Sequence, residues 1–188
     1  MTSFTHVVAI GASAGGIEAI SDVVSHLPAN FRAPVVAALH SRETLAFPDI
    51  LDRCGPLPAR VVNGEATLAP AKVFVCPGGK QSYFEGDRII VTDDKMGLRF
   101  SPSVDVLFSS LAKVHGPRGI AVVMSGRLND GTIGALLANQ EGATTLVQSP
   151  DEARYEEMPS SVILNDHPDS VLPAAEIAER LVDLVGTG

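Results

Sequence analysis

The chain has 188 residues, of which 45% are hydrophobic and 19% are charged, and its formal net charge is −8. This composition fits one globular domain over residues 1–188 and excludes a disordered chain; no apolar run approaches the roughly 20 residues that span a bilayer, so we expect no membrane insertion. The negative charge argues against nucleic acid as the main partner, because phosphate binding needs a basic face and no Lys/Arg-rich stretch supplies one.

Short apolar runs alternate with helix-like segments along the chain. Runs such as VVAI at 7–10 and IAVVM at 120–124 are continuous rather than alternating, which is typical of strands buried on both faces of a parallel sheet. This alternation predicts an α/β fold with a doubly wound, mostly parallel sheet. In chain order, strands are expected at His6–Ile10, Pro34–Leu39, Lys72–Cys76, Gly119–Ser125 and Thr144–Gln148, and helices at Gly16–Leu27, Glu43–Cys54, Ser103–His115, Thr132–Gln140 and Ala174–Val185.

The segment Gln81–Phe100 interrupts this alternation. It contains short β-rich stretches separated by turn signals at Glu85–Asp87 and Asp93–Gly97. Glycine turns between short strands favour antiparallel pairing. We therefore expect a small antiparallel β-hairpin addition beside the main sheet.

Ser13 is the first candidate for chemistry, because ligands of open α/β sheets bind at the carboxyl ends of the strands. It follows the first expected strand within GASAGG at 11–16, and a helix comes next. A G-x-S-x-G motif between strand and helix is the setting of a nucleophile elbow, where small neighbours permit a sharp turn and N–H groups face a developing oxyanion. The same letters also fit a glycine-rich turn that binds phosphate or only packs tightly.

His40 is the histidine that meets the same criterion, because it ends the second expected strand. His6 begins the first strand and therefore belongs to the opposite edge of the sheet. His26 and His115 are near helix C-termini, where we expect a surface role stabilised by the helix dipole, and His167 is in a late loop.

Two aspartates are candidates for the carboxylate that orients a catalytic histidine. Asp130 follows the expected strand at 119–125 and precedes a helix, so it also fits a helix N-cap. Asp151 follows the last expected strand, and position alone does not choose between the two. Because a serine nucleophile needs a base and the base needs an orienting carboxylate, the pattern favours a Ser-His-Asp triad.

Other kinds of site are disfavoured. The order Ser, His, Asp differs from that of the α/β-hydrolases. No H-x-x-x-H, C-x-x-C or carboxylate cluster predicts a metal, and the glycines at 11–16 lack the dinucleotide spacing, so we expect no cofactor. Cys54 and Cys76 fit reduced thiols, and the N-terminus does not read as a signal peptide, so we expect a cytoplasmic protein.

Four blocks of sequence carry a family resemblance: AIGASAGGIEAI at 9–20, APVVAALH at 33–40, PSVDVLFSSLA at 102–112 with GIAVVMSGRLNDGTIGALL at 119–137, and GATTLVQSPDEARYEEMPSSVI at 142–163. VFVCPGGK at 73–80 adds a fifth segment. The chain resembles the catalytic domain of the chemotaxis receptor methylesterases of the CheB type. The resemblance spans nearly the whole chain, and its PSVDVLF, NDG and MPSSVI segments are more specific than the serine motif.

The resemblance implies a Rossmann-like sheet and assigns roles to matching residues. Ser13 is then the nucleophile, His40 the general base and Asp130 the orienting acid, with the Ala14 N–H in the oxyanion hole. The implied reaction is hydrolysis of γ-glutamyl methyl esters on the cytoplasmic helices of receptors, with deamidation of glutamine as a second activity. The receptor helices are the expected protein partner.

The chain departs from the family pattern at the rim of the site. Where Met-Gly usually precedes Asn-Asp-Gly, this chain has Arg127 and Leu128. One hypothesis is that Arg127 binds a carboxylate of an acidic substrate helix; the alternative is a solvent-facing loop arginine. The other departures are Ala14 for a frequent Thr, Ser41-Arg42 for Met-Pro, Lys80-Gln81 for Arg-His, and Phe100-Ser101 where His and Arg commonly precede Pro-Ser-Val-Asp.

The sequence alone does not determine how the protein is regulated or which substrate it acts on. The chain has no room for the N-terminal receiver domain of full-length members, so we expect constitutive activity or control by a separate regulatory protein. Two other functions stay open: a catalytically weak binding module of a signalling complex, and an esterase or amidase of the same fold that acts on another substrate.

Overall fold

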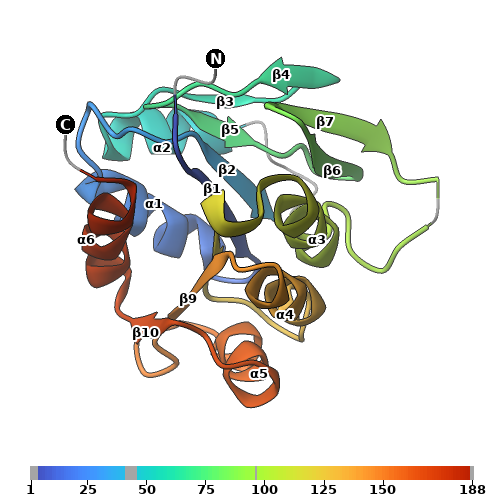
Figure 1. Ribbon diagram of the computed structural model, residues 1–188, viewed down its shortest axis with the longest axis vertical. Helices are drawn as coiled ribbons and strands as arrows, with labels where there is room; N and C mark the ends of the chain where they lie inside the picture. The colour runs from blue at the N-terminus through green and yellow to red at the C-terminus, as the bar shows by residue number, and fades with distance from the viewer. Residues whose placement is uncertain (1–3, 41–45, 96, 187–188) are drawn as a thin grey trace.

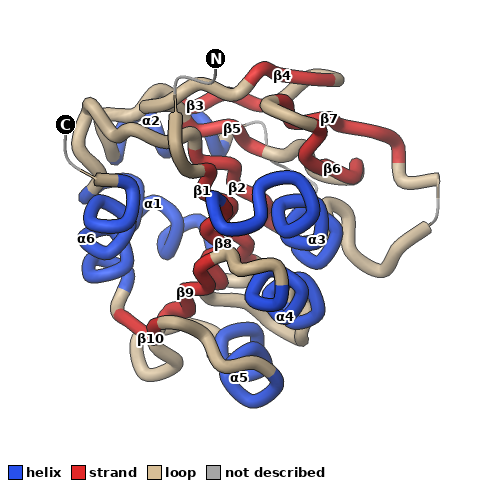
Figure 2. Tube along the Cα trace, in the orientation of Figure 1, coloured by secondary structure: helices blue, strands red, loops and turns tan. Residues whose placement is uncertain are grey.

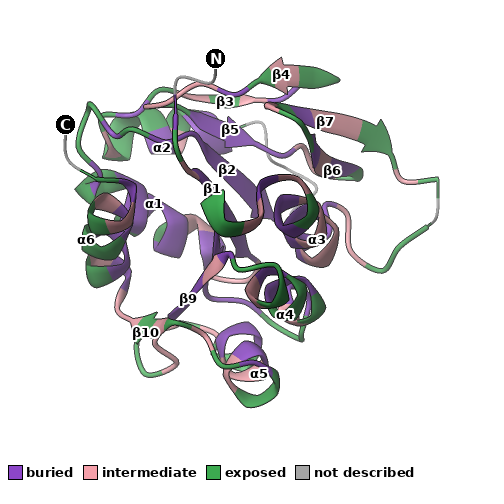
Figure 3. Cartoon of the chain, in the orientation of Figure 1, coloured by how far each residue is buried: buried purple, intermediate pink, exposed green. Residues whose placement is uncertain are grey.

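The main sheet has seven strands in the order β10-β9-β8-β1-β2-β5-β3, and every neighbouring pair is parallel. A computed structural model describes residues 4–40, 46–95 and 97–186 (Figure 1). All six residues of β1 are buried, which explains why its sequence is apolar without alternation (Figure 3). The strands are β1 (Val7–Ala12), β2 (Val35–Leu39), β3 (Ala59–Val61), β5 (Val73–Val75), β8 (Gly119–Val123), β9 (Thr144–Gln148) and β10 (Ser170–Leu172).

Helices cover both faces of this sheet (Figures 1 and 2). Successive residues of β1 point to opposite faces, so Val8 and Ile10 join one hydrophobic core while Val7 and Ala9 join the other. The predicted doubly wound α/β fold is therefore confirmed. The first core packs against α1 (Gly16–His26), α2 (Phe47–Cys54) and α6 (Ala174–Val185), and the second against α3 (Val104–His115), α4 (Thr132–Gln140) and α5 (Glu157–Asn165).

A second, antiparallel sheet contains β4 (Glu65–Thr67), β6 (Lys80–Glu85) and β7 (Arg88–Asp93), in the order β4-β7-β6. Strands β6 and β7 form the predicted hairpin, and its turn includes Gly86 with a φ of 55°. The hairpin packs on α3, since the Phe84 N–H donates to Ser110 Oγ over 3.0 Å. The third strand, β4, is an addition that the sequence pattern did not predict.

Several predicted bounds need correction. The helix expected at 43–54 is observed from Phe47, and its first three expected residues lie outside the described part of the chain. Strands β3 and β10 have only three residues each and no fully buried one, so they leave no apolar run to detect. Helix α5 carries Pro159 in its first turn, where no intrahelical N–H is required. In the described residues, no helix is long and apolar enough to cross a membrane.

His115, expected on the surface, is instead buried with 4% of its area exposed. Its ring meets the ring of Phe84 edge-on at 5.3 Å, because the hairpin covers the end of α3. Its Nε2 has no hydrogen-bond partner among the described residues. Burial lowers the pKa of His115 to about 4, and the positive charge of Arg118 adds to the effect.

This burial predicts a loss of stability in mild acid. Unfolding lets His115 take up a proton between its ordinary pKa of 6.5 and the folded value of about 4, so stability falls as the pH drops through that window. His115→Phe should reduce the loss of unfolding free energy between pH 7 and 4.5 by about 2 kcal/mol. Urea denaturation at a series of pH values measures the effect, and identical pH dependence in both proteins would contradict it.

Candidate active site

The strand order changes direction at β1, which has β2 on one side and β8 on the other. In such sheets a crevice opens at the carboxyl ends of the strands. Ser13 directly follows β1, His40 directly follows β2, and Asp130 lies in the loop after β8. The parallel register aligns the ends of these three strands, so the three predicted residues emerge at one edge of the sheet.

The turn at Ser13 is fixed by backbone hydrogen bonds and by glycines. The Ser13 N–H donates to the Ser125 carbonyl over 3.0 Å, and the Gly16 N–H closes the turn by donating to the Ser13 carbonyl over 2.9 Å. Gly15 has a φ of 71°, and a Cβ there would lie 2.8 Å from Ser125 Oγ. A Cβ at Gly16 would lie 2.6 Å from the Cβ of Ala12, so neither glycine can carry a side chain without movement.

The backbone around Ala14 faces the start of α1. Ser125 Oγ donates to the Ala14 carbonyl over 2.9 Å and orients that peptide. The Ala14 N–H has no hydrogen-bond partner within the described part of the chain. An unpaired N–H beside a helix N-terminus and next to a serine is suited to stabilise negative charge on a bound carbonyl oxygen.

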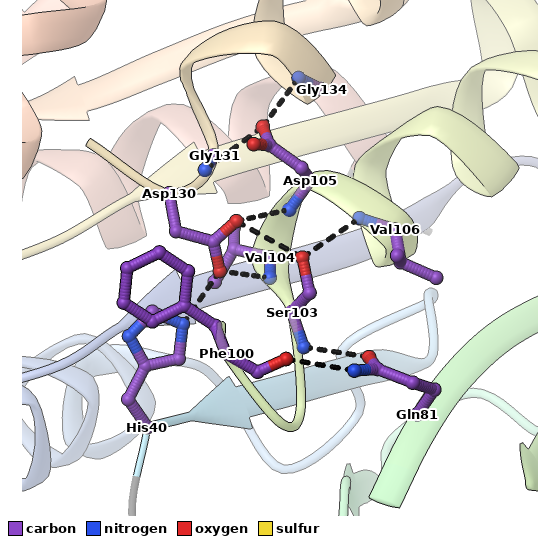
Figure 4. Close-up of polar contacts among 10 residues, drawn as sticks. All are labelled: His40, Gln81, Phe100, Ser103, Val104, Asp105, Val106, Asp130, Gly131 and Gly134. Atoms are coloured by element: carbon purple, nitrogen blue, oxygen red, sulfur yellow. Dashed lines mark hydrogen bonds and ion pairs between the residues drawn. The ribbon is translucent and has the colours of Figure 1, made fainter. Parts of the chain in front are cut away.

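His40 and Asp130 form a short hydrogen bond, with 2.6 Å between Nε2 and Oδ2 (Figure 4). The side chain of His40 is 10% exposed and that of Asp130 is 2% exposed. The other ring nitrogen, Nδ1, takes no part in this hydrogen bond. Phe100 stacks on the His40 ring with 4.7 Å between centroids and 5° between planes, which restricts rotation of the imidazole.

Asp130 does not cap the helix that follows it, whose N-cap is Gly131. Its carboxylate instead accepts hydrogen bonds at the start of α3, from the N–H groups of Val104 (2.6 Å) and Asp105 (3.0 Å) and from Ser103 Oγ (3.0 Å) (Figure 4). Burial by itself would raise the pKa of Asp130, but the hydrogen bonds from His40 and these N–H groups outweigh it, and the pKa is lowered. Asp130 is therefore ionised at neutral pH.

Two further residues support this arrangement and had no predicted role. Gln81 joins both sides of the 100–103 turn, because its Nε2 donates to the Phe100 carbonyl over 2.7 Å and its Oε1 accepts from the Ser103 N–H over 2.9 Å. Ser103 shows the usual signal of a helix N-cap, and its hydroxyl accepts from the Val106 N–H. Gln81, by contrast, occupies a position where the family often has histidine, and no sequence pattern indicated its role.

Asp105 also lies at this junction. Its Oδ1 accepts hydrogen bonds from the N–H groups of Gly131 (3.0 Å) and Gly134 (2.7 Å), at the start of α4. Burial raises the pKa of Asp105 to about 6; the Gly134 N–H opposes this shift, and the negative charge of Asp130 reinforces it. Of the two neighbouring carboxylates, Asp105 therefore takes up a proton first as the pH falls.

Some expected contacts are absent. No hydrogen bond joins Ser13 Oγ to His40 in the described residues. Asp151 is exposed in the turn after β9 and does not contact His40.

Arg127 is exposed, and its guanidinium carbon lies 4.7 Å from the centroid of the Tyr155 ring. The departures at 41–42 lie outside the described residues.

A cavity of about 560 Å³ opens beside His40. It is large enough to admit an esterified side chain, and its lining combines apolar and charged groups. Over the described ranges, no three His, Cys, Asp or Glu side chains are grouped to hold a metal ion. The lining residues are His40, Gly79, Asp94, Leu98, Arg99, Phe100 and Ser101.

The buried role of Asp130 predicts a large loss of stability on truncation. Asp130→Ala leaves three donors at the start of α3 without an acceptor, so we expect the free energy of unfolding to fall by about 3 kcal/mol. Asp151→Ala is the matched control, because this exposed carboxylate should contribute less than about 0.5 kcal/mol. Chemical denaturation at pH 7 measures both, and equal effects would show that the cap contributes little.

Comparisons with known proteins identify relatives of this chain. The family model described as CheB methylesterase matches residues 8–181. "Protein-glutamate methylesterase/protein-glutamine glutaminase 1" of Saccharophagus degradans is 40% identical over 179 residues, which cover 93% of this chain and 49% of that protein. A relative from Pseudomonas putida, "Protein-glutamate methylesterase/protein-glutamine glutaminase of group 1 operon", is 34% identical over 94% of this chain and 48% of its own length.

The chain thus spans about half the length of the curated relatives that it matches. Among solved structures, the Thermotoga maritima CheB methylesterase catalytic domain superimposes with a TM-score of 0.87 at 29% identity, over 96% of this chain and 98% of that one. Fold, sequence and family model agree over nearly the same residues. The chain belongs to the CheB methylesterase family.

Proposed function

We propose that this chain is a single catalytic domain that hydrolyses glutamyl methyl esters on proteins, with Ser13, His40 and Asp130 as a catalytic triad. The observation that carries the proposal is the 2.6 Å hydrogen bond between His40 and the ionised Asp130, at the strand edge that also holds Ser13. Membership of the CheB methylesterase family supports this substrate class. The protein partners are then the methylated cytoplasmic helices of chemotaxis-type receptors.

The reaction follows from the roles of these groups. His40 Nδ1 removes the proton of the Ser13 hydroxyl while Ser13 Oγ bonds to the ester carbonyl carbon, and Asp130 stabilises the imidazolium that forms. The Ala14 N–H donates to the resulting oxyanion. The carbon–methoxy bond then breaks, and His40 returns the proton to the leaving methanol. Water, deprotonated by His40, releases the glutamate carboxylate from Ser13 and restores the hydroxyl.

Substrate binding completes the first of these contacts. Among the described residues no hydrogen bond joins Ser13 to His40, and catalytic hydrogen bonds of this kind commonly tighten only in the complex with substrate. The backbone turn that carries Ser13 is held in place by Ser125 and the neighbouring glycines. Rotation of the Ser13 side chain toward His40 is therefore a local change that leaves this turn in place. The His40 ring is held in place by Phe100 and Asp130.

The same acyl chemistry applies to glutamine side chains, with ammonia in place of methanol as the leaving group. The names of the relatives include a protein-glutamine glutaminase activity, and this supports deamidation as a second reaction. We also propose a cytoplasmic location and control by a separate regulatory protein. The ordered His40–Asp130 pair argues against a binding module that has lost catalysis.

Methanol release from methylated receptor cytoplasmic fragments tests the proposal. Ser13→Ala should lower the rate at least about 1,000-fold while the protein stays folded, because only the nucleophile is lost. Circular dichroism and thermal denaturation of the variant provide the folding control. If wild type and Ser13→Ala release methanol equally, Ser13 is not the nucleophile; if wild type releases none, a different ester or a binding role replaces the proposal.

Arg127 is the proposed source of local attraction to an acidic substrate helix in a chain with a net charge of −8. It is exposed beside the nucleophile turn and stacks on Tyr155, which leaves its N–H groups available to a carboxylate. We expect Arg127→Ala to lower kcat/KM about 5- to 10-fold on ester peptides with flanking glutamates and to leave peptides with flanking glutamines unchanged.

Arg154→Ala is the matched control for this experiment. Arg154 lies over the same Tyr155 ring at 5.9 Å but pairs with Glu18 over 3.5 Å, so its charge is already partnered. This variant should show no preference between the two peptides. An equal loss on both peptides in Arg127→Ala would mean that the arginine acts on the fold of the loop rather than on recognition.

A further inference from the structure

Helices α3 and α4 exchange their capping carboxylates. Asp130, which directly precedes the N-cap of α4, gives its carboxylate to the N-terminus of α3. Asp105, in the first turn of α3, gives its carboxylate to the N–H groups of Gly131 and Gly134 at the N-terminus of α4 (Figure 4). Each helix start therefore holds the acid that belongs to the other helix, and both N-terminal partial positive charges are compensated.

The exchange fixes both the carboxylate and the following peptide bond of Asp130, the acid that contacts His40. The N–H of Gly131 belongs to the peptide bond that immediately follows Asp130, and Asp105 Oδ1 holds it at 3.0 Å. The Asp105 N–H in turn holds Asp130 Oδ1 at 3.0 Å. One residue thus constrains Asp130 through its carboxylate and through its backbone.

Close packing at the two glycines makes this constraint rigid. A Cβ at Gly134 would lie 2.7 Å from the Cβ of Phe108 and 3.0 Å from the Cα of Asp105. A Cβ at Gly131 would lie 2.8 Å from a methyl carbon of Val104. The start of α4 therefore packs closely on the Asp105 backbone at Gly134 and on the Val104 side chain at Gly131, so a shift of Asp105 is transmitted to the 129–131 turn.

We propose that Asp105 is a positioning residue of this active site, whose carboxylate aligns Asp130 with His40 Nε2 by holding the Gly131 and Gly134 N–H groups. In the described part of the chain no hydrogen bond or ion pair joins Asp105 to His40, so Asp105 acts through Asp130. The inference deepens the proposed function, and its kinetic part assumes the esterase activity. The alignment itself can be measured without substrate.

The test compares three substitutions at Asp105. Asp105→Asn keeps an oxygen acceptor for both N–H groups, Asp105→Ala removes it, and Asp105→Glu keeps the charge but moves the carboxylate by one methylene. The first readout is the far-downfield proton resonance of the His40 ring N–H bonded to Asp130, assigned with ring-labelled histidine. The second is kcat and KM on a methyl-ester peptide.

We expect the resonance to persist in Asp105→Asn and to shift upfield or disappear in Asp105→Ala and Asp105→Glu. In the last two variants kcat should fall on the order of 10- to 100-fold with KM unchanged, because misplacement of the acid costs orientation rather than binding. Asp105→Asn should stay within about threefold of wild type, since it keeps the oriented acceptor. The Glu variant keeps the test open if the Ala variant fails to fold.

Asp169→Ala is the matched control for loss of a structural aspartate. Asp169 Oδ2 accepts from the Thr145 N–H over 2.7 Å, at the start of β9 and so at the opposite edge of the sheet. This variant should lose stability without changing kcat or the resonance. A wild-type resonance in folded Asp105→Ala or Asp105→Glu, or its loss in Asp105→Asn, would overturn the proposal even if the protein acts on another ester.

Discussion

The site depends on a carboxylate, that of Asp130, buried at the N-terminus of a helix that it does not belong to. Removing an ion from water is costly unless hydrogen bonds replace the lost solvent. Two N–H groups and the Ser103 hydroxyl at the start of α3 provide those bonds, and His40 provides another. Because the donors belong to the fold rather than to solvent, the acid is ionised and oriented before any substrate arrives.

Ser13, the proposed nucleophile, is held by a different means at the same edge. No charge is buried at Ser13, and its turn is shaped by glycines and by the carbonyl and hydroxyl of Ser125. A Cβ at Gly126 would lie 2.9 Å from the Cβ of Ser13, so close packing reaches Ser13 from the β8 side as well. The loop after β8 therefore contacts the Ser13 turn at its beginning and carries the orienting acid near its end, and one segment sets the spacing between the two.

Sequence patterns predicted those parts of the fold that depend on local burial. Thr144–Gln148 and Thr132–Gln140 begin and end as predicted, because their ends are marked by turn residues. The strand-end criterion brought Ser13, His40 and Asp130 to one edge, but the partners of Asp130 belong to a helix 26 residues earlier in the chain. Long-range hydrogen bonds of this kind leave no periodic signal. The burial of His115 was missed for the same reason, since a hairpin distant in sequence covers it.

Positions that match the family pattern differ physically from a position that departs from it. The acids at the α3–α4 junction each have several partners, so any single change there leaves buried donors unpaired. Leu128 is different: it is 42% exposed and has a φ of 67°, in the left-handed region, where the glycine usual in the family is unstrained. A leucine in this conformation costs about 1–2 kcal/mol, which the Glu157 carboxylate offsets in part by accepting its N–H over 2.8 Å. Strain at a single exposed position is local, so the rim beside Arg127 can change shape and substrate preference while the buried charges that orient His40 stay fixed.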